Sequence, residues 1–180
     1  MAQSKGDAER AQSLYQQALE IDQKILGPDH PNVARDLNNL AELLYSRGND
    51  RAAEPLFRRA LAIDEKSLGT EHPNVASDLN NLALLLESRH DLSGAEPMLR
   101  RAFAIWQKAL GSDHPDVATA TSNLAGLEEA KGDYAQAESL YRSALSIDER
   151  ALGPDHPKTK TIRRNLELLI AKEAAKKSEK

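Results

Sequence analysis

Apolar side chains recur every three or four residues along most of the chain, which is the period of an α-helix that buries one face. In a first type of segment, which begins at Pro31, the apolar positions are Val33, Leu37, Leu40, Ala41 and Leu44. In a second type, which follows Gly48, they are Ala53, Leu56, Phe57, Ala60, Leu61 and Ile63. The pattern therefore predicts pairs of amphipathic helices joined by short turns.

The two types of segment alternate with a fixed period of 42 residues, marked by the glycine of a Leu-Gly-x-Asp/Glu-His-Pro linker at Gly27, Gly69, Gly111 and Gly153. Such a period is typical of repeat arrays, in which each unit packs on its neighbours. We expect one array over residues 1–180, all-α, with about eight helices. It would comprise a half repeat with a second helix only (7–25), three full repeats (26–67, 68–109 and 110–151) and a C-terminal capping helix with a polar tail (152–180).

Local signals indicate where the helices begin and end. Gly27 fits the left-handed position that follows a helix, and Pro31 fits the first position of the next helix. Asp7 is predicted to cap the first helix. Pro55 and Pro97 lie early in second-type helices but beyond the first turn, so these two helices are expected to start late or irregularly.

Composition narrows the class of protein. The chain has no cysteine, which excludes disulfides and thiolate metal sites and is compatible with the cytoplasm. A net charge of −4 argues against a dedicated nucleic-acid binder. No apolar run approaches the ~18 residues of a membrane span, and the N-terminus opens no signal peptide. We therefore expect a cytoplasmic protein with neither a membrane nor a nucleic acid as its partner.

The conserved spacing of small and large residues resembles the tetratricopeptide signature, in which small residues let two antiparallel helices approach closely. The residues that match are Leu40, Ala41, Gly48, Ala53, Phe57 and Ala60, with their equivalents in the next two repeats. The 42-residue unit is similar to the kinesin light chain type of this repeat. The resemblance implies a right-handed α-solenoid of antiparallel helix pairs, with a concave groove for a protein or peptide partner. The sequence has no coiled-coil heptads, so the motor-adaptor role of the light chains does not carry over.

An asparagine column on the first-type helices, at Asn39, Asn81, Asn123 and Asn165, is similar to the groove positions from which these repeats bind the backbone of an extended peptide. An asparagine can donate and accept hydrogen bonds together. The alternative is that these amides bond only to the neighbouring helix. The candidate peptide-binding residues are Arg35, Asn38, Asn39, Glu42, Ser77, Asn80, Asn81, Leu84, Thr119, Ser122, Asn123, Arg164 and Asn165.

Three other features favour structural roles. The histidines His30, His72, His114 and His156 occur once per repeat and do not converge as metal ligands or acid–base groups would, so capping is favoured. Glutamates four residues before Arg58, Arg100 and Arg142 predict ion pairs on a solvated outer face. Trp106 replaces an aspartate found at Asp22, Asp64 and Asp148, which fits either a contact patch or packing beneath a neighbouring helix.

The sequence thus predicts a scaffold that binds a peptide segment or a protein surface in its groove. Two alternatives are a self-associating spacer that stacks through the uncovered face of the first helix, and an interaction module cut from a larger signalling protein. No phosphate loop, nucleophile elbow or paired catalytic carboxylates are readable. We therefore expect no enzyme activity, no small-molecule substrate, no cofactor and no metal.

Overall fold

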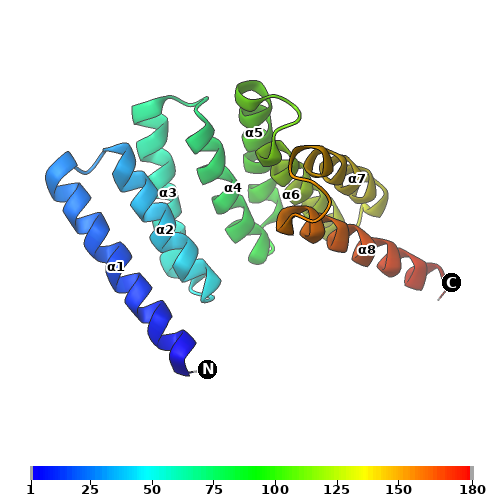
Figure 1. Cartoon of the computed structure of the whole chain (residues 1–180), viewed down its shortest axis with the longest axis horizontal. Coiled ribbons are helices and arrows are strands. Elements are labelled where there is room, and N and C mark those ends of the chain that lie inside the picture. Colours follow the sequence, from blue (N-terminus) through cyan, green and yellow to red (C-terminus); the bar gives the residue numbers. More distant parts are fainter. Residues whose placement is uncertain (1, 179–180) are drawn as a thin grey trace. The chain divides into compact units, whose positions relative to one another are not determined.

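The computed structural model describes residues 2–178, which form eight helices and no strand in that range. The helices are α1 (Ala2–Leu26), α2 (Pro31–Ser46), α3 (Asp50–Leu68), α4 (Pro73–Ser88), α5 (Leu92–Leu110), α6 (Pro115–Lys131), α7 (Tyr134–Ala151) and α8 (Pro157–Ser178) (Figure 1). This confirms the all-α class and the predicted number of helices. Because α1 begins at Ala2, the prediction that Asp7 caps it is wrong.

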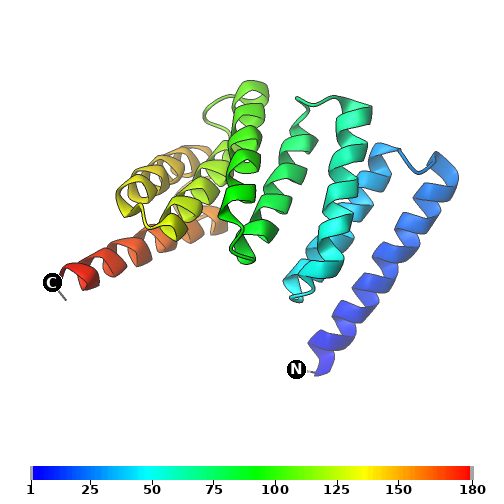
Figure 2. The same cartoon turned by 180° about the vertical axis from the view of Figure 1, so that it is seen from behind.

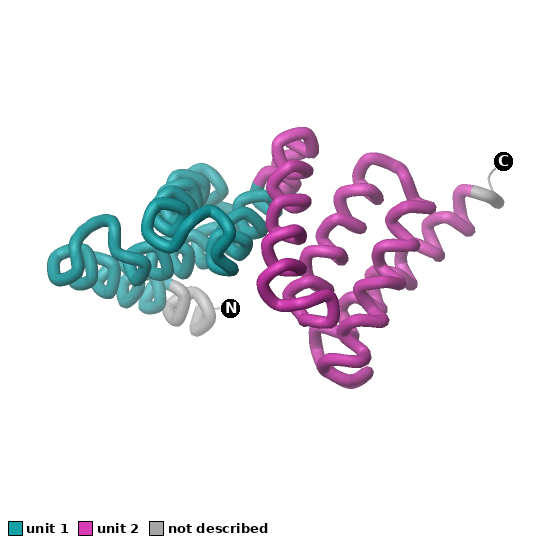
Figure 3. The backbone as a smooth tube through the Cα atoms, turned by 90° about the horizontal axis from the view of Figure 1, so that it is seen from above, with its two compact units in different colours: residues 1–85 teal, residues 86–180 magenta. Residues whose placement is uncertain are grey.

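The chain divides into two compact units, residues 1–85 and residues 86–180 (Figure 3). The boundary falls in the last turn of α4. Each unit is described below by itself.

In unit 1, the first-type helix α2 packs against both α1 and α3. Figure 1 shows α2 in front of α3, and Figure 2 shows the same pair from behind, with α3 in front. Their contact is filled by a buried cluster of Val33, Ala34, Leu37, Ala60 and Ile63. The predicted apolar stripes of the two helix types therefore face one another, as their period requires.

In unit 2, α6 packs against α5 and α7, and α7 packs against α8. The small residues of the signature lie at these contacts: Ala125 on α6 and Ala137 and Ala144 on α7 are fully buried. A larger side chain at any of them would push the two helices apart, because well-packed cores do not absorb extra volume without strain. The signature is therefore a requirement for close helix approach.

The recurring histidines cap the first-type helices. Nδ1 of His30 accepts the backbone N–H of Asn32 at 3.1 Å, and His72, His114 and His156 make the same bond two residues ahead of themselves. The preceding Gly27 has a φ of 91°, which only glycine adopts without a steric cost. The linker motif thus ends one helix and starts the next, and the capping role of the histidines is confirmed.

The expectation that Pro55 and Pro97 delay their helices is wrong. Both prolines lie inside helices, α3 and α5, which begin five residues earlier. The first turns are held instead by side-chain caps, since Asn49 accepts from the backbone N–H of Ala52 at 3.3 Å and Asp91 caps α5 in the same way. A capped first turn fixes the helix upstream of the proline, so the missing N–H costs a single hydrogen bond.

The ion pairs predicted on the outer face are present. Arg58 pairs with Glu54 at 2.8 Å, and the equivalent pairs form at Arg100 and Arg142.

The single tryptophan is buried. Trp106 is only 4% exposed, so it packs inside unit 2 and the alternative of an exposed contact patch is wrong.

None of the helices within residues 2–178 combines the length and the apolar character that crossing a membrane requires.

Candidate functional site

The predicted groove residues of unit 1 come together around a hollow of about 430 Å³, which we call groove hollow 1. The residues that line it come from α2, α4 and the end of α3. They are Pro31, Asn32, Arg35, Asn38, Asn39, Glu42, Asp64, Asn74, Ser77, Asp78 and Asn81. Six of the predicted site residues are in this set: Arg35, Asn38, Asn39, Glu42, Ser77 and Asn81.

Two of the asparagines link neighbouring first-type helices. The amide of Asn38 on α2 donates to the carboxyl group of Asp78 on α4. The amide of Asn81 on α4 donates to Oε1 of Glu42 on α2 at 2.8 Å. These two amides therefore hold α2 and α4 in register, as the alternative interpretation of the column stated. Each asparagine still carries further hydrogen-bonding capacity.

The floor of groove hollow 1 contains two buried acids that the candidate list lacked. Asp64 on α3 is 2% exposed and Asp78 on α4 is 1% exposed. Burial raises the pKa of both carboxyl groups, and burial together with the neighbouring charge of Asp64 brings that of Asp78 to about 7. A buried carboxylate is costly unless hydrogen bonds satisfy it.

Three acceptor oxygens at this floor have no hydrogen-bond partner. They are Oδ1 of Asp64, Oδ2 of Asp78 and Oδ1 of Asn38, all buried. Buried polar atoms in proteins are nearly always paired, so such a cluster requires an explanation. When Asp64 and Asp78 are ionised, the chemistry of this cluster is one-sided, because all three atoms accept and none donates.

The aspartates belong to a paired pattern that the 42-residue period makes visible. Asp22 lies near Asp36 in the first helix contact, and Asp64 lies near Asp78 in the second. At the equivalent positions of the third contact stand Trp106 and Ala120, both buried. The acid column was visible in the sequence, but its burial depends on which helices meet.

Unit 2 has a corresponding hollow of about 330 Å³, groove hollow 2. It is lined by Thr119, Ser122, Asn123, Asp148, Pro157, Lys158, Thr161, Ile162 and Asn165, of which Thr119, Ser122, Asn123 and Asn165 were predicted. Asp148 is fully buried and both of its carboxyl oxygens lack partners. Burial raises its pKa, while the positive charge of Lys158 opposes this shift.

The remaining predicted site residues lie elsewhere. Asn80 is buried and offers little surface to a partner, and Arg164 is exposed and lines neither hollow. The backbone carbonyl of Leu84 accepts from the hydroxyl of Tyr45 at 3.3 Å. These three residues thus line neither groove hollow, whereas the other ten predicted residues line one or the other.

A further hollow in unit 2 is lined by Glu87, Gly126, Glu129, Ala130, Tyr141, Asn165, Leu168 and Lys172. Burial, followed by the charge of Glu129, raises the pKa of Glu87. Lys172 pairs with Glu129 at 3.0 Å and neutralises one of the two acids. One of the two acids of this hollow is therefore balanced by a lysine, and the other is not.

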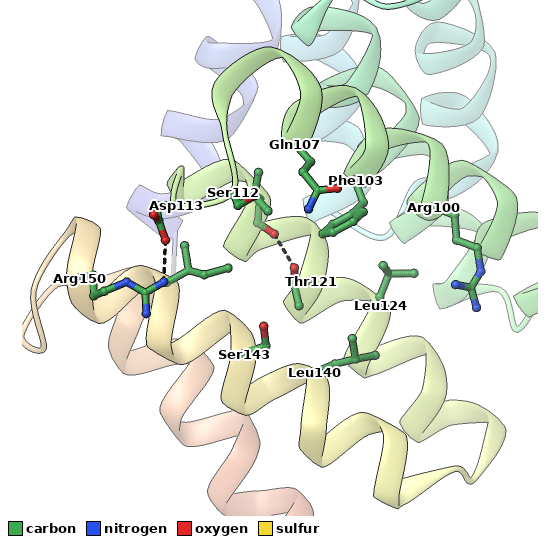
Figure 4. A pocket seen from close by; sticks show the side chains of 12 residues that line it. Arg100, Phe103, Gln107, Ser112, Asp113, Thr121, Leu124, Leu140, Ser143 and Arg150 are labelled. Carbon is green, nitrogen blue, oxygen red and sulfur yellow. Dashed lines mark hydrogen bonds and ion pairs between the residues drawn. The ribbon is translucent and has the colours of Figure 1, made fainter.

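Another hollow of unit 2, about 520 Å³, opens between α5, α6 and α7 (Figure 4). Its apolar lining includes Phe103, Leu124 and Leu140. The polar groups at its edge are paired: Asp113 binds Arg150 at 2.6 Å and the hydroxyl of Thr121 donates to a backbone carbonyl of its own helix. Since no residue that lines it has an unpaired buried polar atom, it shows no chemistry that selects a ligand.

The described part of the chain holds no group of three histidine, cysteine, aspartate or glutamate side chains able to bind a metal ion. In each capping histidine, Nδ1 already accepts a hydrogen bond from a backbone N–H of its own helix.

The family model described as tetratricopeptide repeat matches residues 1–66, 53–108, 79–150 and 116–174. Among curated proteins, no sequence matches the chain.

Solved structures are similar over nearly the whole chain. BtubC (BKLC) from P. vanneervenii has a TM-score of 0.79 and 26% identity, covering 93% of this chain and 66% of that one. A kinesin light chain-like protein of Podosopora anserina, with nearly identical TPR-like repeats, has been solved in two forms, both with 25% identity, covering 98% of this chain and 83% of theirs. Their TM-scores are 0.76 and 0.74.

Repeats of this kind generally mediate protein–protein interactions, and the fold is typically a scaffold. The helix pairs, the buried alanine columns and the matches along the whole chain agree, and the chain belongs to the tetratricopeptide repeat family, with structural neighbours of the kinesin light chain type.

Proposed function

We propose that this chain is a protein-interaction scaffold that binds an extended peptide segment along the first-type helices, in groove hollows 1 and 2. The observation that carries the proposal is the repeated chemistry of the two hollows. Each unit places asparagines on a concave surface above a buried aspartate with unpaired oxygens. An extended peptide presents alternating N–H and C=O groups that such a surface can satisfy.

The side chains available for contact differ between the hollows. In unit 1, Asn39 and Ser77 line the hollow, and in unit 2, Thr119, Ser122 and Asn165 do so. All are short and neutral, so they can approach a peptide backbone without a clash or a charge penalty. We expect the peptide backbone to supply the affinity and the local acids to select side chains.

The proposal is tested by titrating the chain with an unbiased peptide library and measuring affinities of selected peptides by fluorescence anisotropy. Asn39→Ala and Asn165→Ala are each expected to weaken binding about fivefold or more, the loss of one or two hydrogen bonds. Arg58→Ala, which removes an exposed outer-face ion pair, is the matched control and is expected to leave affinity unchanged. An equal loss in all three variants contradicts the groove assignment.

A second candidate function, self-association through α1, is favoured by one observation. Ile21 on α1 is 54% exposed, whereas Ile63, one repeat later, is 4% exposed. Leu14 and Ile25 are exposed on the same helix. On α8, two positions equivalent to buried residues of α2 are the polar Arg163 and Glu167, while Ile170, at the position of Leu44, is apolar and 42% exposed. The larger apolar surface that a second copy could cover is therefore the one on α1.

Such a dimer would be symmetric, α1 against α1, because α1 carries more exposed large apolar side chains than α8. Light scattering after gel filtration at several concentrations measures the mass directly. The wild-type chain is expected to shift towards a dimer as concentration rises, and Ile21→Lys to remain a monomer. A wild-type chain that stays monomeric at the highest concentration removes this candidate.

A further inference from the structure

We infer that groove hollow 1 is a subsite for a cationic side chain, lysine or arginine, of the bound peptide, recognised by the buried acids Asp64 and Asp78. The inference rests on the proposed peptide-binding function and names the chemistry of the partner at one position. It concerns residues that no groove prediction from the sequence contained.

The first argument is the hydrogen-bond inventory of the floor. Asp64 shares a side-chain hydrogen bond with Asn74, and Asp78 accepts one from Asn38. Each carboxyl group keeps one buried oxygen without a donor, and Oδ1 of Asn38 adds a third acceptor. A group that satisfies this floor must bring several donors and no acceptors. Lysine ammonium, with three N–H donors, and arginine guanidinium, with five, are the side chains that meet this condition.

The second argument is charge. The hollow holds three acids, Glu42, Asp64 and Asp78, and a single cation, Arg35. Arg35 is committed elsewhere, to Asp36 at 3.3 Å and to Asp22 at 3.6 Å. The floor acids therefore have no cation of their own. A ligand that brings a positive charge gains from an attraction that is strong where water is excluded.

Groove hollow 2 differs in this respect. The charge of Lys158, which lines that hollow, already acts on Asp148, and the position equivalent to Asp78 is the apolar Ile162. One acid with a nearby lysine does not need a cation from a ligand. The preference for a basic side chain therefore belongs to unit 1.

A proton competes with the cationic ligand for the floor. Burial and the charges of Asp64 and Glu65 on α3 raise the pKa of Asp78 to about 7, so this carboxyl is half protonated in neutral solution. The other charged or titratable groups that face the site are Arg35, Asp36 and Glu42 on α2, and His72 at the start of α4. A bound cation favours the ionised carboxylate, so its binding releases the proton.

The experiment uses short probes that isolate one side chain. Ac-Gly-Arg-Gly-amide, its lysine analogue and its neutral citrulline analogue are titrated into the full chain, and the side-chain amide signals of Asn38 and Asn81 are followed by NMR. The cationic probes are expected to shift these signals and to bind about tenfold tighter than the citrulline probe at about pH 8. Asp64→Asn and Asp78→Asn, which keep the side-chain shape, should each abolish this preference. Asp155→Asn, which removes an exposed acid that lines neither hollow, should retain it.

The pH dependence gives a second readout. Affinity for the arginine probe is expected to fall about tenfold from about pH 8 to about pH 6, as a carboxyl with a pKa of about 7 takes up its proton. In Asp78→Asn this dependence should disappear. A dependence that persists in Asp78→Asn overturns the role of Asp78.

Equal affinity for arginine and citrulline probes, or a charge preference retained in both Asp64→Asn and Asp78→Asn, overturns the inference. If library peptides still bind and are weakened by Asn39→Ala, the proposed groove function stands without the basic subsite. If no peptide of any charge perturbs the asparagine signals, the proposed function itself fails.

Discussion

At the residue scale, the most informative groups are aspartates that the fold buries without full compensation. Asp36, Asp64, Asp78 and Asp148 are all nearly inaccessible, and burial is the largest cause that raises the pKa of each. The free-energy cost of burying a carboxyl group recurs at the same helix contact in successive repeats. Trp106 shows that an apolar residue fits that position. The acids are therefore not required by packing.

Replacing Asp148 by leucine is expected to raise the free energy of unfolding by about 1–3 kcal/mol near pH 7, because both carboxyl oxygens are buried and unpaired. Urea denaturation followed by circular dichroism measures the change. Asp155→Asn is the control, since that acid is exposed and makes a surface ion pair, and it should shift stability by no more than about 0.5 kcal/mol. A destabilised Asp148→Leu protein would mean that this acid has partners that matter to the fold.

The stability of the chain should also depend on pH through Asp78. The folded chain keeps this proton up to about pH 7, whereas the unfolded chain loses it near the ordinary pKa of 3.8. Between these values the folded state binds more protons, so the free energy of unfolding falls as pH rises, by as much as about 4 kcal/mol, and then levels off. The stabilisation is complete below about pH 4.

Urea titrations at a series of pH values measure this slope, and Asp78→Asn should make it shallower. The other buried acids, Asp36, Asp64 and Asp148, contribute in the same direction and remain in the variant. An unchanged slope in Asp78→Asn would show that these acids carry the whole dependence.

At the element scale, the sequence predicted where most helices begin and end, but it did not predict which acids are buried in the groove. The His-Pro starts and the glycine ends depend on residues adjacent in the chain, so local rules predicted them. Asp64 and Asp78 lie on different helices, and nothing local shows that their carboxyl groups become buried together. In α3 and α5 the capped first turn stabilises the helix more than Pro55 or Pro97 destabilises it. Helix propensity alone does not predict which of these two effects is larger.

The turn after α4 contains the one non-glycine residue with a positive φ among those described, His90 at 62°. Gly48 occupies the equivalent position after α2, with the same hydrogen bonds from its own N–H and the next. His90→Gly should therefore stabilise the chain by about 0.5–1 kcal/mol, since relief of the left-handed strain exceeds the added freedom of the unfolded chain. Thermal melts measure this, and Gly48→His should have the opposite sign. A lower melting temperature in His90→Gly would mean that the imidazole makes a stabilising contact.

At the scale of the whole molecule, stability should vary along the chain, because each repeat depends on its immediate neighbours. Helix α1 packs against α2 and leaves Leu14, Ile21 and Ile25 exposed, whereas α7 packs between α6 and α8. Hydrogen exchange followed by mass spectrometry should show amides of α1 exchanging well before those of α7. Equal protection in both helices at low concentration would indicate that something covers α1, and dilution would then test whether a second copy does.

The matched residues at each helix contact also constrain how such a chain can lengthen or shorten by whole repeats. Excising residues 68–109 would set the acid of α3 against Ala120, and excising residues 110–151 would set Trp106 against Ile162. The first junction leaves a lone buried carboxyl, as already occurs at Asp148, and the second joins two apolar residues. The first excision removes Asp78 and with it the pair of acids in groove hollow 1, whereas the second leaves that pair intact. Loss of a repeat would therefore discard or keep the ligand preference according to which contact between repeats it removes.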